Sequence, residues 1–528
     1  MKIRLSNHGF LLSLLLLRPL VASYQAMIIT PVCDFTGAPQ SHLRPLPLCP
    51  VQISEAAQAC PRVHQGLFNE VVTILETRGQ QVQVQISNCF YQTVDRPIPH
   101  TQYWTDRRHL LPLSKLTPQL PLIPAPINYQ LPASLHNPQV VTLKIPYYLA
   151  ETKQTYSAGT RFVLDASPTN RDAFAADFTN YHPTSSTLNY HHLNRSVPLS
   201  QFKAPFTASQ QLPKSAKQLS LTPHLDPVAG PSSYTVYLYD PRSQQFIQAN
   251  LPLHVCALAA NDRRLTAAAQ RQCFIAILKH WTQPPANAEQ ANATKIKPTT
   301  STSSRSSRAE RSPATALRIN SVAGCCERRT QDQHFTAPFI PYAWGGCSYT
   351  ATCTDPHFQL KTTSVTKHLP QPQRRWFSYP TYNLKPATGF DCSGVILRAA
   401  QIAGLPYFYK NTVTILNNLK PLTATDELAD GDLIWLPAHI MVVSDVAQQL
   451  CIEARHYAHG YGKVHEIPIQ KVFGNIPHYA ALKQAHLNQT PIDRLDRQGQ
   501  VRQQVKIKLL KLPLNKTERA ASGPAQCS

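Results

Sequence analysis

A short helix that begins at a cysteine constrains the fold of this chain more than any other segment. Apolar residues recur at helical spacing after Cys392, at Val395, Ile396, Ala399, Ile402 and Ala403. Asp391 is a residue type that favours the N-cap, and Gly404 followed by Pro406 is a typical helix stop. The spacing therefore predicts a buried helix with Cys392 in its first turn.

The first turn of a helix is an environment that suits a nucleophilic cysteine. The positive end of the helix dipole stabilises a thiolate and is expected to lower the pKa of the Cys392 thiol. A buried structural cysteine, or one half of a disulfide, fits the same spacing. The helix by itself therefore leaves the role of Cys392 open.

Three apolar strands are expected after this helix, and two of them carry candidate catalytic residues. The first spans residues 433–436, the second begins with His439, and the third carries Glu453 in an otherwise apolar run. His439 could take the thiol proton and later protonate a leaving amine. Glu453 could hold the second ring nitrogen of His439 and favour the imidazolium form. Taken singly, neither residue specifies catalysis.

Four motifs occur in a fixed order over roughly residues 341–472. They are Y-A-W-G-G at residues 342–346, G-F-D-C-S-G at 389–394, G-D-L-I at 431–434, and the histidine at position 439. This ordered set resembles the NlpC family of papain-like bacterial cell-wall peptidases. The resemblance implies an α+β fold in which the cysteine-bearing helix packs on an antiparallel sheet.

The same resemblance implies roles for individual residues. In that family a cysteine is the nucleophile, a histidine is the base, and a third strand position, most often histidine, orients the base; here these are Cys392, His439 and Glu453. The tyrosine of the first motif, Tyr342, is implied to help the oxyanion site. The residues that flank the cysteine, Asp391 and Ser393, are implied to bind the free amine of an L-Ala-γ-D-Glu substrate. This chemistry needs no metal or other cofactor.

Two β-rich domains are expected before the peptidase motifs, over residues 27–120 and 125–258. The first contains valines that alternate with glutamines after a turn at Arg78-Gly79, and the second contains a hairpin that turns at residues 240–243. Residues 65–71 are similar to a strand of bacterial SH3-like domains, which often precede NlpC domains in pairs. Asn69 replaces a glycine of that pattern, which is acceptable where a positive φ is needed. We therefore expect two SH3-like domains.

The remaining segments are assigned by composition. Residues 1–23 have the layout of a secretory signal peptide, whose apolar run is too short to span a bilayer. A helix is expected over residues 262–282, which either begins the peptidase domain or bridges the domains. Residues 283–316 have almost no large apolar residue and predict a disordered linker. The peptidase domain is expected over residues 317–484 and a basic tail over residues 485–528.

An aromatic and basic run at residues 374–379 interrupts the spacing between the first two motifs. It predicts either a loop that contacts substrate or a lid that makes no such contact.

The signal-peptide layout of residues 1–23 predicts an exported protein, periplasmic or secreted. The chain has 51 Lys+Arg and 29 Asp+Glu, a formal net charge of +22, which suits an anionic partner. Export makes nucleic acid an unsuitable partner and favours a cell-wall polymer. Thirteen cysteines are an odd number, so at least one thiol lacks a partner within the chain, and disulfides plus one functional thiol are expected. No paired C-x-x-C spacing indicates zinc.

The resemblance implies a cysteine endopeptidase that hydrolyses peptidoglycan stem peptides, with the γ-D-glutamyl–diamino acid bond as the expected site of cleavage. Two alternatives stay open. One is a non-catalytic cell-wall-binding protein with a silent peptidase domain, and the other is an amidase or acyltransferase on the same fold.

Overall fold

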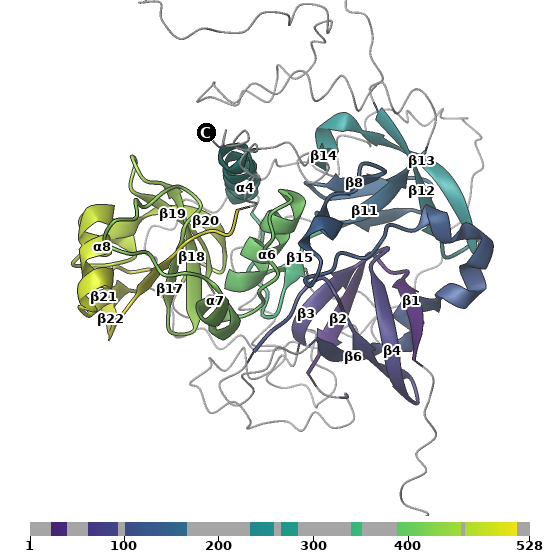
Figure 1. The fold of residues 1–528 in the computed structure, drawn as a ribbon, viewed down its shortest axis with the longest axis horizontal. Coiled ribbons are helices and arrows are strands. Elements are labelled where there is room, and N and C mark those ends of the chain that lie inside the picture. Colours follow the sequence, from purple (N-terminus) through teal and green to yellow (C-terminus); the bar gives the residue numbers. More distant parts are fainter. Residues whose placement is uncertain are drawn as a thin grey trace, which may run out of the picture.

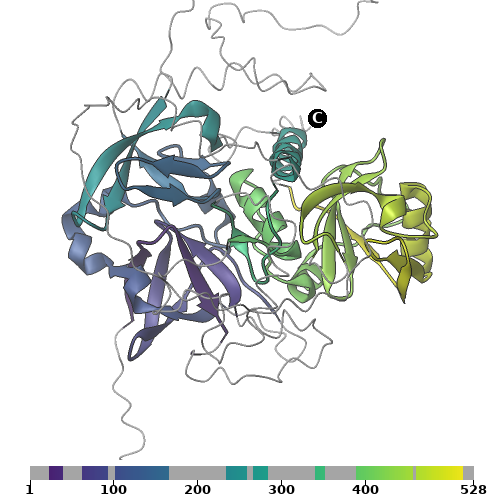
Figure 2. The same ribbon diagram turned by 180° about the vertical axis from the view of Figure 1, so that it is seen from behind.

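The computed structural model describes residues 23–37, 39, 62–92, 101–165, 233–257, 266–283, 339–350, 388–455 and 460–514. These residues form an α+β structure with three larger sheets, and helix α6 (Cys392–Ile402) lies between the β-rich N-terminal half and the C-terminal sheet (Figures 1 and 2). Residues 1–22 of the expected signal peptide, residues 284–316 of the expected linker and the run at 374–379 lie outside the described residues.

The first sheet has seven strands in the order β3-β2-β6-β5-β4-β1-β7. Its strands are β1 (Tyr24–Ile28), β2 (Val32–Thr36), β3 (Arg62–Leu67), β4 (Val71–Arg78), β5 (Gln81–Gln85), β6 (Gln102–Asp106) and β7 (Leu110–Pro112). The expected turn joins β4 to β5, where Gly79 has a φ of 59°. Val82 and Val84 are buried, as their alternation predicts, and Asn69 has the positive φ of 67° expected for it.

The second sheet has five strands in the order β13-β12-β11-β8-β14, beside the hairpin of β9 and β10. Its elements are β8 (Val140–Leu143), β9 (Tyr147–Leu149), β10 (Gln154–Tyr156), β11 (Arg161–Leu164), β12 (Ser233–Asp240), β13 (Gln245–Pro252) and β14 (Cys256–Ala257). The hairpin expected from the sequence is the β12–β13 pair. The described part of these two units also contains the 3-10 helices η2 (Arg107–His109), η3 (Leu113–Leu122), η4 (Pro132–Leu135) and η6 (Leu253–Val255).

The third sheet has five antiparallel strands in the order β20-β19-β18-β17-β23. They are β17 (Leu433–Leu436), β18 (His439–Asp445), β19 (Leu450–Arg455), β20 (Lys463–Pro468) and β23 (Lys508–Leu510). The surrounding elements are α4 (Ala267–Thr282), β15 (Cys347–Ser348), β16 (Gly389–Phe390), α7 (Thr412–Asn418), η9 (Ile469–Lys471), α8 (Tyr479–Asn488), β21 (Ile492–Leu495) and β22 (Val501–Val505).

The two faces of this third sheet pack against different elements. Ile440 and Val442 belong to the core that contains α4 and α6, whereas Met441 and Val443 pack with α8 and the β21–β22 hairpin. This alternation follows from the two-residue period of a strand. The segment expected to be a basic tail therefore completes the fold: β23 pairs with β17, and the hairpin covers the face opposite α6. The boundary expected at residue 484 is too early.

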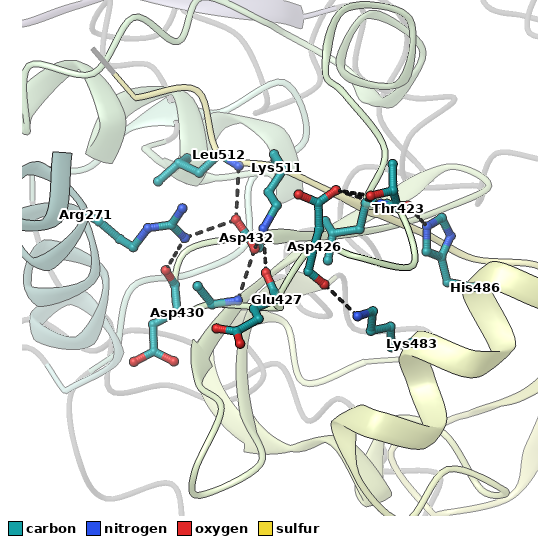
Figure 3. A network of polar contacts seen from close by, with 12 residues as sticks. Arg271, Thr423, Asp426, Glu427, Asp430, Asp432, Lys483, His486, Lys511 and Leu512 are labelled. Carbon is teal, nitrogen blue, oxygen red and sulfur yellow. Dashed lines mark hydrogen bonds and ion pairs between the residues drawn. The ribbon is translucent and has the colours of Figure 1, made fainter. Parts of the chain in front are cut away.

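Helix α4 packs on the third sheet, and Figure 3 shows one of its anchors. Nη1 of Arg271 lies 3.0 Å from Oδ1 of Asp432, which is fully buried and also accepts from the Leu512 amide at 3.2 Å. At the other end of α4, the Trp281 ring stacks on Phe390 with centroids 4.7 Å apart. Trp281 also donates from Nε1 to the Lys144 carbonyl at 3.0 Å. Helix α4 is thus part of the C-terminal unit and contacts the second sheet.

Candidate active site

Cys392 is the first residue of α6, and the backbone around it has the expected helix cap. The Asp391 carboxylate accepts from the Gly394 amide, which is the N-cap bond that the sequence predicts. The Cys392 thiol is partly exposed and bonds the backbone of Ile440, the residue after His439. Among the described residues, no hydrogen bond joins the thiol to the His439 ring.

The protonation of Cys392 differs from the expectation. Burial raises the pKa of the thiol to about 12, and the neighbouring Asp391 charge adds to this effect, while Lys410 and backbone hydrogen bonds oppose it. The expected lowering of the pKa by the helix N-terminus is therefore wrong for this structure. Burial and the Asp391 charge outweigh Lys410 and the backbone hydrogen bonds, so the thiol is the resting form.

The Asp391 carboxylate accepts from Ser393 and pairs with a lysine that no sequence motif marks. Oγ of Ser393 donates to Oδ1 of Asp391 at 3.0 Å, and Nζ of Lys410 lies 2.8 and 2.7 Å from the two carboxylate oxygens. All three side chains are buried. The carboxylate proposed for a substrate amine is thus already paired with an ammonium group of the chain. No motif in the sequence marks Lys410, because it follows α6 in a connecting segment.

His439 and Glu453 form the contact expected from their positions on neighbouring strands. Nε2 of His439 lies 2.8 Å from Oε2 of Glu453, across the neighbouring strands β18 and β19. Burial lowers the pKa of His439 to about 4, although the Glu453 charge and hydrogen bond act to raise it. The imidazole is therefore neutral at pH 7, and the expected preference for imidazolium is wrong. The contact leaves Nδ1 as the ring nitrogen that Glu453 does not occupy.

Two further side chains hold the Glu453 carboxylate, and no local sequence pattern indicates either role. Nε2 of His465 lies 3.3 Å from Oε1, and Nη2 of Arg494 lies 2.8 Å from Oε2. Burial acts to raise the pKa of Glu453, but Arg494 and the hydrogen bonds from the two histidines hold it well below its usual value. Arg494 lies on β21, beyond the expected domain boundary, and nothing in the local pattern I-D-R-L distinguishes it from a solvated arginine.

Tyr342 supports the segment that enters α6. The backbone of Tyr342 forms a parallel β-bridge with Phe390, and the amide of Ala343 donates to the Phe390 carbonyl at 3.1 Å. Cys347 on β15 pairs with Phe390 on β16 in the same region. Tyr342 is buried in the core that includes Phe390, two residues before Cys392. The backbone of the first motif is therefore hydrogen-bonded to the backbone of the cysteine motif, and we call these two paired segments the motif block.

The first sheet also forms hydrogen bonds to the motif block. Nε of Arg62 donates to the Trp344 carbonyl at 2.8 Å. Oε1 of Gln65 accepts from the Cys347 amide at 3.1 Å and from Oγ of Ser348 at 2.7 Å. Arg62 and Gln65 are both buried, and both lie on β3. The N-terminal unit is therefore a structural neighbour of the site.

The cysteines of the described residues differ from the disulfide expectation. Seven of them form no disulfide with one another, namely Cys33, Cys89, Cys256, Cys273, Cys347, Cys392 and Cys451. The other six lie outside the described residues. No group of three or more His, Cys, Asp or Glu side chains in the described part of the chain is placed to hold a metal ion. No described helix is long and apolar enough to cross a membrane.

No protein-family model matches the chain, and no curated protein matches it in sequence. Similar solved structures include an NlpC/P60 family protein from Bacillus cereus ATCC 10987, at 13% identity and a TM-score of 0.40, over 87% of this chain and 96% of that one. NlpC2 from Trichomonas vaginalis is similar at 8% identity and a TM-score of 0.25, over 86% of this chain and 95% of that one. NlpC1 from the same organism is similar at 7% identity and a TM-score of 0.22, over 94% of each chain. Similarity at this level assigns neither a family nor an activity.

Proposed function

We propose that this protein is a cysteine endopeptidase that hydrolyses peptidoglycan stem peptides, with Cys392 as nucleophile and His439 as base. The observation that carries the proposal is the buried His439–Glu453 contact at the start of β18, next to the backbone that the Cys392 thiol bonds. A nucleophile, a base and a group that orients the base are the parts that acyl transfer needs. The ordered motifs at residues 342–346, 389–394 and 431–434 favour the same chemistry.

The proposed reaction begins from a neutral thiol and a neutral imidazole. As Sγ of Cys392 bonds to the γ-D-glutamyl carbonyl carbon, Nδ1 of His439 takes the thiol proton, while Nε2 stays on Glu453. The negative charge moves to the carbonyl oxygen, where the Cys392 amide and Tyr342 would stabilise it. The C–N bond then breaks and the proton passes to the leaving amine. Water cleaves the resulting thioester and returns a proton to the thiol.

The proposed substrate also fits the proposed location. A chain with a formal net charge of +22 is attracted to an anionic cell-wall polymer, and residues 1–23 suit export to the compartment where that polymer lies. Asp391 and Ser393 would contact the substrate amine only if it displaces or joins Lys410, because Lys410 occupies the carboxylate in this structure.

The test uses the purified full chain and defined muropeptides, with release of the diamino-acid fragment followed by mass spectrometry. Cys392→Ala is expected to abolish release. Cys273→Ala removes another partly exposed thiol, on α4, and is expected to leave release unchanged. Undiminished cleavage by the Cys392→Ala protein would overturn the assignment.

A silent wall-binding protein is the second candidate, and two observations favour it. No hydrogen bond joins the Cys392 thiol to the His439 ring in the described structure, and the thiol pKa is raised to about 12. Such a protein would bind purified sacculi equally well with and without Cys392 and release no peptide. An amidase or acyltransferase would instead be recognised in the same digest by its different product.

A further inference from the structure

The Glu453 carboxylate is buried among three nitrogen donors, and only one of them is part of the proposed reaction. Nε2 of His439 and Nη2 of Arg494 both lie 2.8 Å from Oε2, while Nε2 of His465 lies 3.3 Å from Oε1. The Glu453 and Arg494 side chains are each 2% exposed. A buried carboxylate this close to an imidazole favours the imidazolium form unless another charge compensates it.

Arg494 reaches Glu453 on the face of the third sheet that is opposite α6. Glu453 alternates along β19 with Ile452 and Ala454, which pack toward α6, so its carboxylate lies on the opposite face of the sheet. The β21–β22 hairpin covers that face and brings Arg494 to it. Within the described residues, Glu453 is the one carboxylate that forms an ion pair with Arg494.

The remaining contacts of Arg494 fix the orientation of its guanidinium group. Nη1 lies 3.4 Å from Sδ of Met441, and the guanidinium carbon lies 5.5 Å from the centre of the Phe473 ring. A planar guanidinium held on an aromatic ring and a thioether has little freedom to leave the carboxylate. Its position is therefore set by packing as well as by charge.

The charges that act on the His439–Glu453 pair come from several elements. They are Arg455 on β19 and Arg494 on β21, and His465 on β20 adds a hydrogen bond to Glu453. Asp391 and Lys410 pair with each other beside Cys392 at the start of α6, and Arg502 on β22 acts on Arg455. Arg494 and Arg455 both lower the pKa of His439, and Arg494 is the larger of the two effects. Arg455 is directed elsewhere, because its Nη1 donates to the Leu495 carbonyl at 2.9 Å.

We propose that Arg494 is a positioning residue of the candidate active site. Its guanidinium keeps the Glu453 carboxylate ionised on Nε2 of His439 and compensates its charge, so that Glu453 orients the ring without drawing a proton onto it. A neutral base is the form that can accept the thiol proton of Cys392. This inference rests on the proposed function only in the identity of the base, since the charge balance around His439 exists whatever the substrate is.

The test measures the rate at which iodoacetamide alkylates Cys392 as a function of pH, with the Cys392 peptide quantified by mass spectrometry. Arg494→Met preserves the apolar contacts with Met441 and Phe473 but removes the charge. The His439–Glu453 pair then keeps its proton to higher pH. The alkylation rate falls on the acid side of the pH profile (the acid limb), and the pH at the midpoint of this fall is expected to rise by about one unit or more. Arg494→Lys keeps the charge and is expected to keep the midpoint close to that of the unmodified protein.

Three further variants separate charge balance from structural support. Glu453→Gln leaves the arginine charge beside His439, so the midpoint is expected to fall, and Glu453→Gln with Arg494→Met is expected to restore it. This pair of variants also tests Arg494 if Arg494→Met alone does not fold. Arg271→Met removes an arginine that pairs with buried Asp432 and is expected to destabilise the protein without moving the midpoint. Circular dichroism establishes that each variant is folded.

The outcomes distinguish this inference from the proposed function. If Arg494→Met keeps the unmodified midpoint, or if Glu453→Gln and the double variant share one midpoint, the positioning role of Arg494 is wrong, whether or not muropeptides are cleaved. If the midpoints move as expected and no variant or unmodified protein cleaves muropeptides, the role of Arg494 stands and the proposed substrate is wrong. Where cleavage occurs, its acid limb is expected to move together with that of alkylation.

Discussion

Nη1 of Arg398 lies 3.1 Å from Oε1 of Glu70, and this ion pair joins the helix that begins at Cys392 to the N-terminal sheet. Arg398 is fully buried, and its Nε also donates to the Cys347 carbonyl at 3.1 Å. Gly159, with a φ of 90°, lies against the same side chain, where a Cβ would clash with it. The first sheet, the second sheet and the cysteine helix therefore meet at one arginine.

Arg398→Met is expected to destabilise the whole protein, because it leaves Glu70 and several carbonyl groups without their donor. Breaking a buried ion pair from one side typically costs about 3–5 kcal/mol. Glu70→Gln keeps a hydrogen-bond acceptor for Arg398 and is expected to cost less, since the Glu70 side chain is 18% exposed. Urea unfolding measures the free energy of unfolding of both variants. Equal stability of Arg398→Met and the unmodified protein would show that the N-terminal sheet does not support the helix.

The end of the folded C-terminal unit can be tested by truncation. A chain that ends at residue 484 loses β23 from the sheet edge, the hairpin that covers the sheet, and Arg494. It is expected to be insoluble or to lack a cooperative unfolding transition. A chain that ends at residue 514 keeps these elements and is expected to unfold at the same temperature as the full chain. Calorimetry compares the two, and a cooperative transition in the shorter chain would contradict the structure.

Lys410 is expected to increase the reactivity of Cys392. Its ammonium lowers the thiol pKa and pairs with Asp391, whose charge raises it. Lys410→Met therefore leaves the Asp391 charge uncompensated, and alkylation of Cys392 at pH 8 is expected to become several-fold slower. Lys420→Met, at an exposed position before β17, is the matched control and is expected to have no effect. Faster alkylation of the Lys410→Met protein would show that Lys410 does not lower the pKa of the Cys392 thiol.

Stability is expected to fall as the pH decreases from about 6.5 to 4. Burial lowers the pKa of His439 from 6.5 to about 4, and it also lowers the pKa of His64 and His109. A base with a lowered folded pKa stabilises the protein fully above its unfolded pKa, and this contribution is lost as the pH falls toward the folded value. For His439 the loss amounts to about 3 kcal/mol.

His64 offers a way to check this dependence away from the candidate site. Its ring is fully buried, stacks on Phe35 with centroids 5.9 Å apart, and has no hydrogen-bond partner among the described residues for either nitrogen. His64→Phe removes a titrating group from this aromatic cluster. The difference in unfolding free energy between pH 7 and pH 5 is expected to shrink in this variant. An unchanged difference would mean that His64 is not neutral in the folded protein.

Local pattern predicted the elements that carry the candidate site. The helix after Cys392, its Asp391 cap, the strand that begins at His439 and the strand that carries Glu453 all follow from residue spacing. The pairing of His439 with Glu453 was predictable because neighbouring antiparallel strands bring such positions together. Lys410 and Arg494 were not predictable, because their partners are distant along the chain or lie on another layer of the fold.

The α+β character, the order of the elements and the positions of the candidate residues Cys392, His439 and Glu453 thus follow from the amino-acid sequence, since they depend on short-range periodicity and residue type. The tertiary structure alone decided where the C-terminal unit ends, which sheets support the cysteine helix, and the protonation of Cys392 and His439. Those properties depend on burial and on charges brought together by long-range packing. A helix N-terminus that would favour a thiolate in isolation holds a neutral thiol here, because desolvation opposes the charged form more strongly.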